Sequence, residues 1–125
     1  MVEISVIIPC YNEGENLKRI AHSIEKIIKN NSTKIEFIIV NNGSTDNSIN
    51  IIKELNKHYF KSIHLKNNIG YGGGILEGIK NSSGEIVSWT HGDIQCDLND
   101  VIIAYNKYKN ELKNNLCIIK GRRIN

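Results

Sequence analysis

Four side chains able to bind a metal ion or interact with an anion follow a short apolar run near residue 90. The run at 86–89, Ile-Val-Ser-Trp, is typical of a buried strand, and the residues that follow it include His91, Asp93, Gln95 and Asp97. In an open α/β sheet, ligands bind beyond the carboxyl ends of the strands. Carboxylate and amide oxygens are ligands that Mg²⁺ and Mn²⁺ accept. We therefore predict that this segment holds a divalent metal ion against a diphosphate.

Asp93 is the strongest candidate ligand of this segment. Gln95 and His91 each lie two residues from Asp93, so in extended backbone the three side chains point to the same side. Imidazole suits Mn²⁺ better than Mg²⁺, and His91 is equally well explained as a strand-end histidine bonded to a backbone carbonyl. Asp97 is placed to cap a helix that starts just after it.

Apolar runs typical of strands alternate with helical spacing along the whole chain. Strands are predicted at 3–9, 35–40, 62–65, 85–90 and 116–119. Helices are predicted at 15–29, after the turn at 41–46 with Ile51, Ile52, Leu55 and Tyr59 on one face, from Ile75 with Leu76 and Ile79 buried, and from Asp97 to Leu112. This alternation predicts an α/β fold, a Rossmann-type open sheet that is mainly parallel and has helices on both faces.

Three polar loops are predicted to meet at one edge of this sheet. The segments 9–13, 41–46 and 91–97 each follow a predicted strand. Polar loops occur in any protein, but three of them at the carboxyl edge favour a binding site. The glycine-rich loop at 70–74 matches neither the dinucleotide fingerprint nor the phosphate-binding P-loop. We expect its backbone to approach a ligand or a neighbouring strand closely.

The composition excludes several classes of function. The chain has 125 residues, which suits one small domain, and its net charge of +3 comes without a dense basic stripe before 120–123, so we expect no nucleic-acid partner. The cysteines, Cys10, Cys96 and Cys117, lack disulfide or metal spacing, which favours reduced thiols in the cytoplasm. Cys10 has no base beside it in sequence and is interpreted as a small buried residue. The sequence leaves open a peripheral association with a membrane and a homodimer.

Taken together, the motifs resemble those of the family 2 glycosyltransferases, which have the GT-A fold. The matching segments cover essentially the whole chain and are 6–13 (VIIPCYNE), 40–48 (VNNGSTDNS), 68–70 with the later Gly84-Glu85, 91–95 (HGDIQ) and 121–123 (GRR). The Asp-x-Gln part of the fourth segment is closest to the polyprenyl-phosphate mannosyltransferase-like members. The resemblance identifies residues 1–125 as the donor-binding part of a GT-A domain.

This resemblance implies a UDP- or GDP-linked sugar donor and a glycan or lipid-linked acceptor. The residues implied to bind the nucleotide sugar are Pro9, Tyr11, Asn12, Glu13, Asn42, Ser44, Gly70, Gly92, Asp93 and Arg123. Within this set, Asn42 would contact the base and Arg123 the diphosphate. Asp93 would bind the metal, Mn²⁺ or Mg²⁺, with Gln95 and with His91 as a third ligand.

The chain departs from the family pattern at two motifs. His91 replaces the first aspartate of the Asp-x-Asp motif, and Asn41-Asn42 replaces the usual acids, so metal binding should be weaker or its preference changed. The general base and the acceptor site of the family usually follow the Gly-x-Arg element, so we expect them outside residues 1–125. The predicted function is metal-assisted, inverting sugar transfer. The alternatives are a non-catalytic nucleotide-binding or interaction fragment and, less well matched by the loop 11–13, a nucleotidyltransferase.

Overall fold

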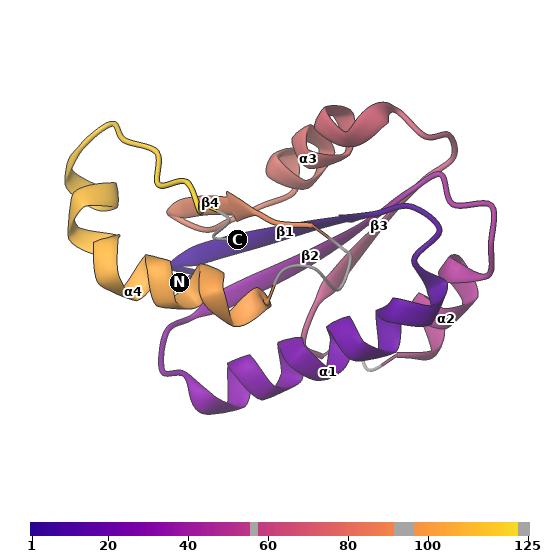
Figure 1. Ribbon diagram of the computed structural model, residues 1–125, viewed down its shortest axis with the longest axis horizontal. Helices are drawn as coiled ribbons and strands as arrows, with labels where there is room; N and C mark the ends of the chain where they lie inside the picture. Colours follow the sequence, from indigo (N-terminus) through magenta and orange to yellow (C-terminus); the bar gives the residue numbers. More distant parts are fainter. Residues whose placement is uncertain (56–57, 92–96, 123–125) are drawn as a thin grey trace.

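The computed structural model describes residues 1–55, 58–91 and 97–122. In these ranges four strands alternate with four helices (Figure 1). The strands are β1 (Ile4–Cys10), β2 (Ile35–Asn42), β3 (Lys61–Leu65) and β4 (Ile86–Trp89). The helices are α1 (Gly14–Asn30), α2 (Ser48–Glu54), α3 (Gly70–Lys80) and α4 (Leu98–Asn114).

The four strands form one parallel sheet in the order β3-β2-β1-β4, which confirms the predicted α/β fold. Cys10 at the end of β1 lies beside Asn41, and Asn42 lies beside Leu65 at the end of β3. β4 is shorter and ends at Trp89, opposite Ile7. All four carboxyl ends therefore face the same edge, and the loops that follow them are brought together there.

Alternate side chains of β1 and β2 point to opposite faces of the sheet. Apolar side chains therefore need burial on both faces, and helices cover both. Val6 and Ile8 pack into the larger core, with residues of α1, α2 and α4, whereas Ile7 packs into a smaller core with Ile79 of α3. Figure 1 shows α3 on one side of the sheet and α1 and α2 on the other. α3 can approach closely because Gly78 has no side chain: a Cβ there would lie 2.4 Å from Ile7 Cγ2.

The two long helices follow the predicted patterns. α1 buries Leu17, Ile20, Ile24 and Ile27, the face expected from the spacing of the apolar residues. α4 begins after Asp97, whose carboxylate accepts a hydrogen bond from the backbone N–H of Asn99 at 2.9 Å. This bond confirms Asp97 as the N-cap. None of the helices in the described ranges has the length and apolarity that a membrane crossing requires.

Two predictions for the α3 region were wrong. Its glycine-rich segment is not a loop, because α3 begins at Gly70 and its first five residues include these glycines. Leu76 is 59% exposed, because Gly74, Ile75 and Gly78 form the face that meets the sheet and Leu76 points the other way.

Two further elements also differ from prediction. α2 ends at Glu54, so Leu55 and Tyr59 follow the helix, although both still pack against the larger core. Residues 116–119 form no strand: Leu116 and Ile118 are exposed, and the segment pairs with none of the described strands. An apolar run becomes a strand only where a neighbouring strand satisfies its backbone groups.

Candidate functional site

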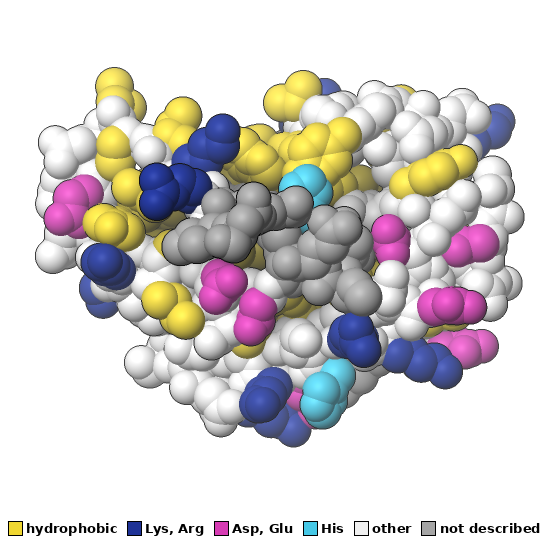
Figure 2. Space-filling model, viewed as in Figure 1, with side chains coloured by type: hydrophobic (Ala, Val, Ile, Leu, Met, Phe, Trp, Pro, Cys, Tyr) yellow, Lys and Arg dark blue, Asp and Glu magenta, His cyan; other side chains and the backbone are white. Residues whose placement is uncertain are grey.

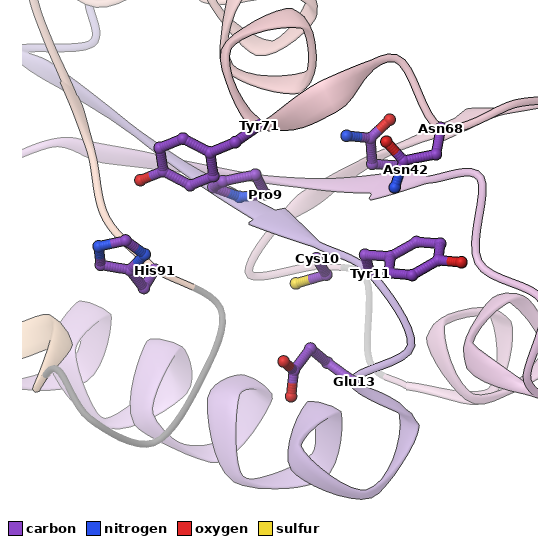
Figure 3. Close-up of a pocket in the computed structure, with 8 residues that line it drawn as sticks. All are labelled: Pro9, Cys10, Tyr11, Glu13, Asn42, Asn68, Tyr71 and His91. Carbon is purple, nitrogen blue, oxygen red and sulfur yellow. The ribbon is translucent and has the colours of Figure 1, made fainter.

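A cavity of about 240 Å³ opens at the carboxyl edge of the sheet (Figure 3). Its lining residues come from the end of β1 and the loop after it, the end of β2, the loop after β3, the start of α3 and the loop after β4. They are Pro9, Cys10, Tyr11, Glu13, Asn42, Asn68, Tyr71 and His91. The loops after β1 and β4 thus reach the site as predicted, together with the end of β2 and the start of α3.

The end of β1 supplies Pro9 and Cys10 to the cavity. Cys10 is buried, and its thiol lies 3.7 Å from the carbonyl oxygen of Ile8. Burial, with a smaller effect of the Glu13 carboxylate, raises the pKa of the Cys10 thiol to about 12. The thiol is therefore protonated at neutral pH, and Cys10 is a packing residue, in agreement with its interpretation from sequence.

The loop after β1 is joined to the loop after β2 by Asn12 and Ser44. Asn12 has a φ of 52°, a left-handed conformation that asparagine tolerates better than most residues. Its Oδ1 accepts a hydrogen bond from the backbone N–H of Thr45, and its own N–H donates to Ser44 Oγ at 3.0 Å. Both residues were predicted to contact the donor. In the structure they connect the two loops and do not line the cavity.

Asn42 joins the end of β2 to the start of α3. Its side-chain oxygen accepts a hydrogen bond from the backbone N–H of Ile69 at 3.0 Å, and its Nδ2 donates to the carbonyl of Gly70 at 2.8 Å. Gly70 has a φ of +83°, which glycine adopts without strain, and its N–H is held by Asn68 Oδ1 at 2.8 Å. Gly70 is thus a turn residue held by Asn42 and is not among the lining residues.

Tyr71 and His91 form one wall of the cavity. Their ring centroids lie 5.3 Å apart and their planes differ by 18°, so the rings are stacked. Figure 3 shows this pair on one side of the cavity and Tyr11 on the other. Both rings remain accessible at the surface. On the face seen in Figure 2, hydrophobic, basic and acidic side chains are interspersed.

The structure brings together five of the residues predicted from sequence: Pro9, Tyr11, Glu13, Asn42 and His91. The predictions on Gly92, Asp93, Gln95 and Arg123 fall outside the described residues. Among the residues that are described, no group of three or more acidic, histidine or cysteine side chains could hold a metal ion. The metal site therefore stays a prediction.

Sequence reasoning missed three lining residues: Cys10, Asn68 and Tyr71. Cys10 and Asn68 stand inside motif segments beside residues that were selected, so their position in those motifs was an available indication. Tyr71 lies between Gly70 and Gly72 at the start of α3, where only the fold reveals that it faces the cavity.

The arrangement of sheet and helices is that of the GT-A glycosyltransferases. The fold is similar to that of the mannosyltransferase PcManGT from Pyrobaculum calidifontis, solved in complex with GDP-Man and Mn²⁺, with a TM-score of 0.69 and 20% sequence identity over 85% of this chain and 32% of that one. The chain belongs to glycosyl transferase family 2, whose model matches residues 5–123.

Curated relatives of the chain are longer enzymes with different names. A poly-beta-1,6-N-acetyl-D-glucosamine synthase of Staphylococcus epidermidis is 36% identical over 95 residues, which are 75% of this chain and 22% of that protein. The dolichyl-phosphate beta-glucosyltransferase ALG5D of Trichomonas vaginalis is 31% identical over 131 residues, 98% of this chain and 40% of that protein. The chain thus spans 22% and 40% of these two relatives.

Proposed function

We propose that residues 1–125 are the donor-binding part of a glycosyltransferase that transfers a sugar from a UDP- or GDP-linked donor, with inversion and with the help of a divalent metal. The observation that carries this proposal is the cavity at the carboxyl edge of the sheet. There, Pro9, Tyr11, Glu13 and Asn42, all from segments that resemble the family motifs, meet His91 from the loop after β4.

The side of the cavity near Tyr11 suits a nucleoside. The Tyr11 ring is 47% exposed and offers a planar apolar surface against which a base can stack. Glu13 Oε2 accepts a hydrogen bond from Asn16 Nδ2 at 2.7 Å, which orients the carboxylate. In this proposal the carboxylate accepts hydrogen bonds from ribose hydroxyls, and Asn42 keeps the start of α3 in place beside the base.

The opposite side suits the diphosphate and the metal. Asp93, Gln95 and His91 offer a carboxylate, an amide oxygen and an imidazole, and a set with only one carboxylate and a nitrogen ligand suits Mn²⁺ better than Mg²⁺. His91 is the one of these three in the described ranges, and it lines the cavity with an accessible ring, which fits this role. When bound, the metal would neutralise charge on the nucleoside diphosphate leaving group. Gly92 and Arg123 complete the proposed contacts to the diphosphate.

We propose a glycan or a lipid-linked phosphate as the acceptor. The names of the two relatives, a poly-N-acetylglucosamine synthase and a dolichyl-phosphate glucosyltransferase, include both kinds. The acceptor site and the general base belong, in this proposal, to a part of the protein outside residues 1–125. A lipid-linked acceptor would bring the protein to the cytoplasmic surface of a membrane without requiring that this part span it.

Calorimetric titration with UDP-glucose, UDP-N-acetylglucosamine and GDP-mannose tests the proposal. Each nucleotide sugar is titrated in three separate experiments, one with Mn²⁺, one with Mg²⁺ and one with a chelator. We expect saturable binding of one nucleotide class, strengthened by Mn²⁺. Asp93→Asn should remove the metal-dependent part, whereas Asp100→Asn, an exposed acid in the first turn of α4, should leave it unchanged. Absence of binding to every donor would contradict the proposal.

A transfer assay separates the proposal from its alternative. Incubation of the donor that binds with a polyprenyl-phosphate or an oligosaccharide acceptor measures product directly. Binding without any transfer by the complete natural protein would favour a non-catalytic nucleotide-binding module.

A further inference from the structure

The contact between Tyr71 and His91 joins the start of α3 to the loop after β4. Tyr71 is the second residue of α3, which covers the smaller core, and His91 follows β4 at the edge of the sheet. The rings meet at 5.3 Å with nearly parallel planes, and both line the cavity. This contact is therefore one of the places where α3 and the loop after β4 are held at a defined separation.

The backbone on each side of the pair is anchored to the sheet. On one side, Asn42 holds the carbonyl of Gly70, directly before Tyr71. On the other side, Thr90, directly before His91, donates its N–H to the carbonyl of Ile7 at 3.0 Å. The two side chains, in contrast, extend to the surface, and Tyr71 is 48% exposed. At the surface, the imidazole of His91 therefore lies against the ring of Tyr71.

We propose that Tyr71 is a positioning residue, whose ring fixes the imidazole of His91 as the cavity wall opposite Tyr11 and thereby determines how tightly the donor is held. This inference rests on the proposed function. An exposed histidine without a stacking partner samples several rotamers, and donor binding must then order it at an entropic cost. The interaction free energy of a stacked aromatic pair corresponds to a factor of about 2 to 12 in an equilibrium constant, here the dissociation constant of the donor.

Proton NMR of the chain without any ligand tests the contact itself. The chain has four histidines, so the imidazole resonances are few, and His91→Gln assigns those of His91 by their loss. We expect ring-current shifts at His91 that disappear in Tyr71→Leu and persist in Tyr71→Phe, which keeps the ring. Unchanged His91 resonances in Tyr71→Leu would overturn the inference.

A double-mutant cycle then tests the effect on the donor. Titrations compare the wild type, Tyr71→Leu, His91→Ala and the double variant, using the nucleotide sugar that binds the wild type. We expect each single variant to weaken donor binding by about 2- to 12-fold. The affinity of the double variant should be no lower than that of the single variant with the lower affinity. Tyr71→Phe should bind the donor like the wild type. Leu76→Ala, an exposed position on the same helix, should bind like the wild type, and thermal unfolding should show that all variants are folded.

The outcomes distinguish this inference from the proposed function. If the wild type binds no donor, the proposed function fails. If the wild type binds and Tyr71→Leu binds equally well, the proposed function stands and the role of Tyr71 is refuted. Additive losses in the double variant, or a Tyr71→Phe variant as weak as Tyr71→Leu, would also refute it, because the coupling would then not depend on the stacked ring.

Discussion

The side-chain oxygen of Asn12 accepts a hydrogen bond from the backbone N–H of Thr45 at 2.8 Å, which ties the loop after β1 to the loop after β2. Asn12 stands between Tyr11 and Glu13, the two residues that reach into the cavity from the first loop. Asp46 also donates its N–H to the same oxygen, at 3.2 Å. The shape of the cavity at this side therefore depends on a residue that does not line it.

Replacing Asn12 tests this dependence. Asn12→Ala removes the side-chain hydrogen bonds and places alanine in a left-handed conformation, so we expect the free energy of unfolding to fall by about 1–3 kcal/mol. Asn12→Gly loses the same bonds but adopts the positive φ without strain, so its loss should be smaller. Urea unfolding measures both. A glycine variant less stable than the alanine variant would argue against the conformational part of this explanation.

Asn42→Asp should destabilise the protein although it changes only one group. A carboxylate can accept the hydrogen bond from Ile69 but cannot donate to the carbonyl of Gly70, and it is charged at a position that is 3% exposed. We expect a loss of about 1–3 kcal/mol at pH 7, which becomes smaller as the pH falls and the introduced carboxyl gains a proton.

Asn68→Asp is the matched control for this change. Asn68 uses its oxygen to accept the N–H of Gly70, a role that a carboxylate keeps, and Asn68 is exposed. Its unfolding free energy in urea should stay within about 0.5 kcal/mol of the wild type. Equal losses of unfolding free energy for the two variants would show that the hydrogen bond donated by Asn42 Nδ2 does not cause the destabilisation.

Glu36 should make the protein sensitive to acid. Its side chain is 9% exposed, and burial alone would raise its pKa, but hydrogen bonds from Lys61, Ser5 and Ser83 outweigh burial and lower the pKa from 4.5 to about 2. A lowered pKa stabilises the folded protein above pH 4.5, and this contribution is lost as the pH falls from about 4.5 to about 2.

Glu36→Gln checks this window. Because Lys61 is 55% exposed and its attraction is screened, we expect the variant to be about 1–3 kcal/mol less stable than the wild type at pH 7. The difference should shrink between pH 4.5 and pH 2 in urea titrations. Glu25→Gln, which removes an exposed i,i+4 pair with Lys29, should cost no more than about 0.5 kcal/mol. A difference for Glu36 that does not vary with pH would contradict the assignment.

Thiol labelling should separate the two described cysteines. In a Cys96→Ser background, a disulfide reagent at pH 8 should react at Cys117, which is exposed, and leave Cys10 unmodified in the folded protein. The raised pKa of Cys10 leaves only about one thiolate in ten thousand at that pH. Mass spectrometry of peptides locates the label. Rapid labelling of Cys10 would show that its thiol is more accessible and has a lower pKa than the structure indicates.

Much of the fold could be predicted because its elements carry strong local patterns. The apolar runs in β1 and β2 predict buried strands, and the spacing of Leu17, Ile20 and Ile24 predicts α1. The run at 116–119 carries the same pattern as a strand but forms none, because pairing depends on a neighbour that local composition does not specify. Leu76 was misjudged for a similar reason: the glycines beside it, not the larger residue, form the packed face of α3.

The site could be predicted only in part for reasons of tertiary contact. The motif segments identified Pro9, Tyr11, Glu13 and Asn42 as neighbours of one cavity. The same segments could not show that Asn12 and Ser44 join the loop after β1 to the loop after β2 by hydrogen bonds, since these bonds depend on how the two loops lie together. The contact between Tyr71 and His91 depends on β4 ending opposite Ile7, a register that no local pattern contains.

The glycine-rich first turn of α3 has a consequence for how the molecule moves. Glycine is less favourable than alanine in a helix by about 1 kcal/mol per residue, and Gly72, Gly73 and Gly74 follow one another near the start of α3. The turn therefore has little stability of its own and depends on the amide of Asn42 and on the contacts of Tyr71. The wall of the cavity formed by α3 should open locally more often than the sheet beneath it, so amide hydrogens here should exchange early, and a bound donor should slow them.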